Sequence, residues 1–155
     1  MLKYKDTMVT FSEVPDEISL CINITNCPMM CIGCHSPELR QDIGEYLDLY
    51  SLIDLIDANE DITCVCIMGG DADILGVEDI MEDIKTYYPN LLTAWYSGRY
   101  YIPKNIDLNL YDFIKIGSYQ KRLGPLNSKT TNQRMYKIIH DKDNTLEDIT
   151  SKFWK

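Results

Sequence analysis

Strand-like apolar runs alternate with segments of helical periodicity along most of this 155-residue chain. The run 62–68 is almost wholly apolar, which is typical of a parallel strand buried on both faces of a sheet. The segment 77–88 places apolar residues three and four positions apart, which indicates an amphipathic helix. The same criteria predict strands at 18–25, 91–96, 113–116 and 135–140, and a helix at 46–59. This alternation indicates an α/β fold with a mostly parallel sheet.

The chain is too short for a closed parallel barrel, which takes about 250 residues. We therefore expect an incomplete, open parallel β/α barrel that forms a single domain over residues 1–155. Near the end of the chain, Thr145 and Asp148 have the spacing of a capping box and predict a short C-terminal helix.

Three cysteines lie in one short segment directly after the first expected strand. Cys27, Cys31 and Cys34 are spaced x3 and x2, and Pro28 and Gly33 between them indicate a loop. Thiolates are the ligands of iron–sulfur clusters and of zinc. Structural zinc takes four ligands, and the ferredoxin run is spaced differently. Three thiolates would leave one metal position open for catalysis. The alternatives are three small buried residues, or a zinc site completed from elsewhere in the chain.

The other three cysteines, Cys21, Cys64 and Cys66, fall in expected strands. Cys64 and Cys66 share one face of a strand because side chains alternate with a period of two. A second metal cluster is one interpretation. Packing in the core is the favoured one, because free cysteine is among the most buried residue types.

Glycine and polar residues follow each of the later expected strands. The segments are Gly69-Gly70-Asp71, Ser97-Gly98-Arg99 and Gly117-Ser118. The carboxyl ends of parallel strands share one face, so these segments should converge on the cysteine loop. A glycine pair lets the backbone approach a ligand closely, and Asp71 could then meet an ammonium group. Taken alone, the glycine pair is better explained as an ordinary strand-to-helix turn.

The formal net charge of −9 argues against binding to nucleic acid or to anionic membranes, which relies on basic patches. Residues 1–6 lack the apolar core of a signal peptide, and no apolar run reaches the ~20 residues of a membrane-spanning helix. We expect a cytoplasmic protein. Six cysteines in such a protein suggest metal binding or catalysis before disulfides.

The cysteine segment resembles the Cys-x3-Cys-x2-Cys motif of radical S-adenosylmethionine enzymes. In that superfamily the three cysteines hold a [4Fe-4S] cluster, and the amino and carboxylate groups of S-adenosylmethionine chelate the fourth iron. Reduction of the cluster cleaves the sulfonium to a 5′-deoxyadenosyl radical. The resemblance implies that Cys27, Cys31 and Cys34 are the catalytic metal ligands. It further implies that the ammonium of S-adenosylmethionine is bound by Gly69, Gly70 and Asp71, with Ala72 where the superfamily often has proline.

Within the superfamily, the chain resembles the activating proteins of anaerobic ribonucleoside-triphosphate reductase. The likeness covers about residues 15–140 and rests on Gly33 before the third cysteine, on the aromatic-Ser-Gly segment around Ser97, and on the polar element Thr130–Arg134. It implies cofactor contacts for Gly33, Cys34, His35 and Ser97. For His35 an ordinary capping or hydrogen-bonding role is the alternative.

Two departures from that family stand out. Ile116 precedes Gly117 where the family commonly has Asp-Gly, and Ser128-Lys129 stands where the family has Arg-Gly. Contacts that the family makes at these positions are therefore not carried over to this chain.

The resemblance implies an enzyme that removes a Cα hydrogen from a glycine of a large partner reductase, leaving a stored glycyl radical. A flavodoxin or ferredoxin would supply the electron, and Arg99 and Lys121 are candidate charges at the docking rim. The alternatives are an activase of another glycyl-radical enzyme, a small radical enzyme acting on a metabolite, and a non-catalytic iron–sulfur or zinc-binding module.

Overall fold

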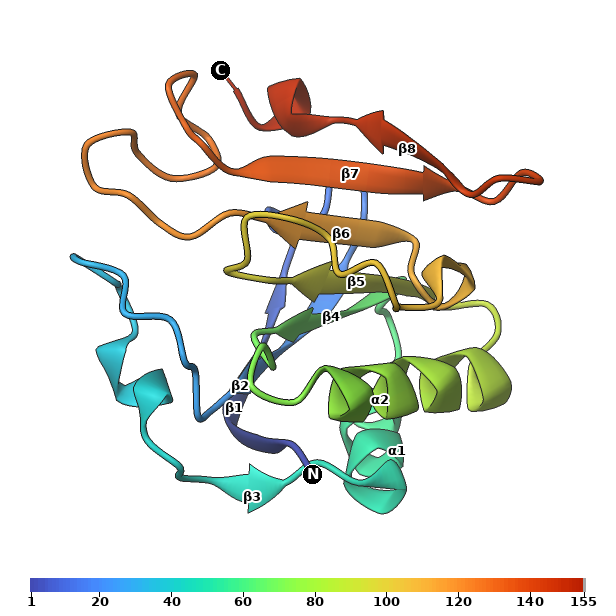
Figure 1. Cartoon of the computed structure of the whole chain (residues 1–155). Helices are drawn as coiled ribbons and strands as arrows, with labels where there is room; N and C mark the ends of the chain where they lie inside the picture. Colours follow the sequence, from blue (N-terminus) through green and yellow to red (C-terminus); the bar gives the residue numbers. More distant parts are fainter. Residues whose placement is uncertain (155) are drawn as a thin grey trace.

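The computed structural model describes residues 1–154 and contains one mixed eight-stranded sheet with two α-helices (Figure 1). The strands are β1 (Lys3–Thr10), β2 (Ser19–Ile24), β3 (Glu45–Tyr46), β4 (Cys64–Met68), β5 (Leu92–Tyr96), β6 (Phe113–Ile116), β7 (Arg134–Ile139) and β8 (Thr145–Asp148). The helices are α1 (Leu49–Asp57) and α2 (Ile74–Tyr87), with short 3-10 turns at Pro37–Arg40, Leu108–Leu110 and Thr150–Phe153. The predicted α/β class is confirmed.

The sheet is parallel only in its centre. Its strand order is β3-β1-β2-β4-β5-β6-β7-β8. Strands β2, β4, β5 and β6 run parallel, whereas β1, β3, β7 and β8 pair antiparallel with their neighbours. The prediction of a mostly parallel sheet is therefore wrong for the flanks. A parallel neighbour needs a crossover connection, usually a helix, whereas β1 and β2, and likewise β7 and β8, are joined by connections in which no helix is described.

Helices α1 and α2 cover one face of the sheet (Figure 1). Ile22, Ile67 and Trp95 are fully buried on that face and form the main core with both helices. Alternate residues of the same strands point to the opposite face and build a second apolar cluster, in which Ala94 and Phe113 are buried. The sheet is thus apolar on both faces in its centre, as a parallel segment requires.

Both helices begin at an aspartate that accepts a hydrogen bond from an otherwise free backbone N–H group. The Asp48 side chain accepts from Ser51 N at 2.9 Å, and Asp48 N donates to Ser51 Oγ at 2.9 Å. The Asp73 side chain accepts from Gly76 N at 3.0 Å. The turn after β4 therefore ends at a capped helix start, which holds residues 69–71 in place.

The prediction of a capping box and helix at Thr145 is wrong. Thr145–Asp148 forms strand β8 on the edge of β7, and the chain turns into a 3-10 helix only at Thr150. Asp148 leads into that turn, since its Oδ1 accepts from Thr150 N at 2.9 Å. No helix among residues 1–154 is long and apolar enough to cross a membrane.

The prediction that Cys21, Cys64 and Cys66 pack in the core is confirmed. All three are at most 1% exposed, and Cys21 lies opposite Cys66 in the parallel β2–β4 pair. Burial raises the pKa of Cys64 to about 12. This thiol therefore stays protonated and inert at neutral pH.

Candidate functional site

The cysteine loop and the turns after β4, β5 and β6 gather at one edge of the sheet, on the left in Figure 1. The four central strands run in one direction, so their carboxyl ends meet there, as predicted. Backbone hydrogen bonds continue the ladder into the turns: Gly69 N donates to Tyr96 O at 2.9 Å, and Ser97 N to Lys115 O at 2.8 Å. These hydrogen bonds hold the turns after β4, β5 and β6 rigidly together, and we call these three turns the platform of the cysteine loop.

The loop with Cys27, Cys31 and Cys34 is irregular and is held mainly from outside. Cys27 N donates to Leu39 O at 2.9 Å, and Arg40 Nη2 donates to Cys31 O at 2.8 Å. Inside the loop, Cys34 N donates to Cys31 O at 3.3 Å. All three thiols are partly exposed, unlike the core cysteines. They are thus the thiols that a ligand from solution can reach.

Cys27 lies within electrostatic reach of the other two thiols and of Asp71. Burial is the main cause that raises the pKa of Cys27, and the negative charges of Asp71, Cys31 and Cys34 raise it further. As the side chains stand, no three His, Cys, Asp or Glu residues in the described chain are gathered closely enough to hold a metal ion. The donor set fits an iron–sulfur cluster in its chemistry, because three accessible thiols share one loop.

Asp71 is 4% exposed, and protein groups bind both of its carboxylate oxygens. Ser97 Oγ donates to Oδ1 at 2.6 Å and Gly98 N donates to Oδ2 at 2.8 Å. The guanidinium of Arg99 lies 3.6 Å from Oδ1 through Nε, and its Nη2 donates to the Asp71 carbonyl at 2.8 Å. Asp71 therefore ties the end of β4 to the turn after β5. The contact of Asp71 with an ammonium group stays a prediction. The ammonium would have to bind the carboxylate lone pairs that Ser97 Oγ and Gly98 N leave free.

Both glycines of the predicted turn are required by the backbone. Gly69 and Gly70 have φ of +106° and +94°, in the region that side chains other than glycine rarely adopt. A Cβ on Gly70 would also lie 2.5 Å from Val77 Cγ2, so its absence lets α2 pack close to the strand end.

The cysteine loop packs directly on the platform through Met29. A Cβ on Gly98 would lie 2.7 Å from Met29 Cγ, which shows how closely these two segments approach each other. On the other side, a Cβ on Gly33 would lie 3.5 Å from the Tyr119 ring, and the His35 ring is 5.5 Å from the same ring. Ser97 and His35 are thus brought to the same edge as the cysteines, with His35 exposed to solvent.

The element Thr130–Arg134 fastens the long 117–133 loop to the end of β6. Gln133 Nε2 donates to Gly117 O at 3.3 Å, and Asn132 Nδ2 donates to Ser118 O at 3.0 Å. Gln133 N donates to the Thr131 hydroxyl at 3.0 Å. Its described contacts are structural, and they position Tyr119 beside the cysteine loop.

Sequence reasoning missed Lys115, which reaches this edge from inside β6. Its Nζ donates to Gly117 O at 2.7 Å and to Ser97 O at 3.3 Å, and the residue is 8% exposed. A lysine within the apolar run 113–116 was the available signal.

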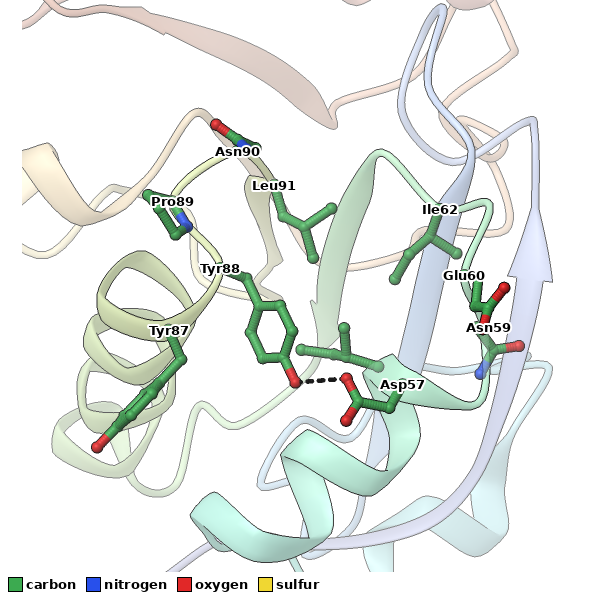
Figure 2. Close-up of a pocket in the computed structure, with 10 residues that line it drawn as sticks. Asp57, Asn59, Glu60, Ile62, Tyr87, Tyr88, Pro89, Asn90 and Leu91 are labelled. Carbon is green, nitrogen blue, oxygen red and sulfur yellow. Dashed lines mark hydrogen bonds between the residues drawn. The ribbon is translucent and has the colours of Figure 1, made fainter.

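Two surface pockets differ in their position relative to the cysteine loop. One of about 520 Å³ borders the cysteine loop and is lined by Met29, Gly98 and residues 99–104. Another of about 620 Å³ lies at the opposite end of the sheet, between the ends of α1 and α2 (Figure 2). There Tyr88 Oη donates to Asp57 Oδ1 at 2.7 Å above an apolar floor that includes Leu91 (Figure 2). Of these two pockets, the first is the one that a residue of the cysteine loop, Met29, helps to line.

No family model, curated protein or solved structure matches the chain.

Proposed function

We propose that this protein is a radical S-adenosylmethionine enzyme that generates a glycyl radical on an anaerobic ribonucleoside-triphosphate reductase. The observation that carries the proposal is the Cys-x3-Cys-x2-Cys loop beside the Gly-Gly-Asp turn, at the carboxyl edge of four parallel strands. This edge is where parallel α/β folds build their sites. We further propose that β2, β4, β5 and β6 are the preserved part of an open parallel β/α barrel.

Cys27, Cys31 and Cys34 would hold the [4Fe-4S] cluster. With S-adenosylmethionine bound, such a cluster supplies a 5′-deoxyadenosyl radical on one-electron reduction. Gly69 and Gly70 would let the backbone approach the bound cofactor, since neither carries a side chain. The pocket of about 520 Å³ beside Met29 is large enough for a small-molecule cofactor.

The rim of this edge supports a protein as the substrate. Met30, Ile32, Tyr100 and Tyr101 are large apolar side chains that are exposed on the loops bordering the site. Large apolar side chains that are exposed on loops beside a site favour an interaction surface there. Residues 97–134 also contain seven lysines and arginines against two acidic residues, in a chain of net charge −9. A partner with an acidic contact surface would therefore be steered to this edge.

Anaerobic reconstitution with iron and sulfide, followed by reduction with S-adenosylmethionine, tests the proposal. We expect cluster absorption and 5′-deoxyadenosine, and a glycyl-radical doublet by electron paramagnetic resonance once a cognate reductase is added. Cys31→Ala should abolish iron binding, whereas the matched control Cys64→Ala should retain it, because Cys64 lies in the core. Full iron content in Cys31→Ala, or zinc in anaerobically purified protein, would contradict the proposal. 5′-deoxyadenosine with a small metabolite and no doublet with any reductase would indicate a different substrate.

A further inference from the structure

Lys115 carries the most deeply buried lysine charge in the described chain, in the middle of the apolar strand β6. Its neighbours Ile114 and Ile116 face the helix-covered core, while Lys115 points to the other face, where its Nζ lies 5.8 Å from the centre of the Tyr96 ring. None of the ion pairs formed by residues 1–154 includes it. An ammonium without a counter-ion is costly to bury, so an apolar residue at this position would make β6 more stable.

The contacts of Lys115 direct its charge toward the cysteine edge. Its two acceptors, Ser97 O and Gly117 O, both belong to turns of the platform. Ser97 precedes Gly98, against which Met29 of the cysteine loop packs. Lys115 Nζ therefore bonds Ser97, the residue next to the glycine that the cysteine loop contacts.

The acidic groups of the site act on Lys115 in turn. Burial lowers the pKa of Lys115 to about 8, and Asp71, Cys31 and Glu13 oppose this shift. At neutral pH the ammonium form still predominates. Because the charge is buried, salt screens it little.

We propose that Lys115 is a positioning residue that stabilises the reduced state of the cluster held by Cys27, Cys31 and Cys34; this inference rests on the proposed function. One-electron reduction adds one negative charge to the cluster, and the electron comes from a low-potential donor. A nearby buried positive charge favours the more negative state. Because Lys115 Nζ bonds both Ser97 O and Gly117 O, the same residue also holds the ends of β5 and β6 together.

The test is a redox titration of the reconstituted protein without S-adenosylmethionine, followed by electron paramagnetic resonance. Lys115→Met should lower the equilibrium constant for reduction about tenfold, which is ~59 mV for one electron. Lys115→Gln keeps a hydrogen-bond donor but loses the charge, and should show the same shift. Lys115→Arg should stay close to the wild type. Lys137→Met removes an exposed lysine of β7 and is the matched control, with no shift expected.

The outcomes separate this inference from the proposed function. A wild-type potential in both neutral variants overturns the role of Lys115 while the cluster itself stands. An equal shift in Lys115→Arg overturns it too, because charge would not be the cause. If the wild type binds no cluster, the proposed function fails first and this inference falls with it. If Lys115→Met does not fold, the decision rests on Lys115→Gln.

Discussion

Asp71→Ala is the substitution whose effect the structure defines most closely. It removes the acceptor of Ser97 Oγ (2.6 Å) and of Gly98 N (2.8 Å), together with the partner of Arg99 at 3.6 Å. A buried donor left without its acceptor costs about 1–3 kcal/mol. The Arg99 side chain is 41% exposed, so its ion pair adds little. We expect the free energy of unfolding to fall by about 2–4 kcal/mol.

Urea unfolding of the protein without iron or S-adenosylmethionine measures this loss. With a slope of about 2 kcal/mol per molar, the midpoint should fall by about 1–2 M. Asp57→Ala is the matched control, because Asp57 is exposed and bonds only the Tyr88 hydroxyl. It should cost at most about 1 kcal/mol. An Asp71→Ala midpoint equal to that of Asp57→Ala would refute the conclusion that Asp71 ties the strand ends together.

The same variant separates the two roles of Asp71. If the carboxylate also binds the ammonium of S-adenosylmethionine, a charge-assisted bond of about 1.5–3 kcal/mol is lost and affinity falls by about one to two orders of magnitude. A titration of the reconstituted variant measures it. Lower stability with unchanged affinity would make Asp71 purely structural.

Two further predictions concern other parts of the molecule. Burial raises the pKa of Asp112, but the hydrogen bonds from Lys85 (2.5 Å), Thr93 N and His140, together with the positive charge of Lys85, outweigh burial, so the pKa is lowered. Its contribution to stability is therefore complete above the unfolded-state pKa of about 3.9 and is lost as pH falls through the lower folded-state pKa. Asp112→Asn should flatten the acid limb of stability against pH, and an unchanged limb would contradict this. Gly98→Ala should displace Met29 and speed alkylation of the cysteine-loop thiols, and Met29→Ala, which removes the same contact, should speed it too. Unchanged labelling in Gly98→Ala would show that the contact does not hold the loop.

Several elements could be predicted from the sequence because their signal is local. The expected strand 113–116 coincides with β6, and the two helices and the central strands lie within a few residues of their predicted bounds. Strand β1 was missed because Lys3, Lys5 and Asp6 interrupt its alternation. Thr145–Asp148 has the composition of a helix start, but pairing with β7 makes it a strand. The local sequence pattern of a segment does not show which strand the segment will pair with in the folded protein.

The meeting of the cysteine loop with the glycine-bearing turns followed from the sequence, since the carboxyl ends of parallel strands must share an edge. The individual side-chain contacts at that edge could not be predicted from the sequence. The approach of Met29 to Gly98, the bonding of Asp71 by Ser97, and the burial of Lys115 all join residues far apart in the chain. Periodicity and spacing determine which segments become strands and where the thiols lie. Only the packed tertiary structure determines which charges are buried beside them, because that depends on side chains that the fold brings together from different strands.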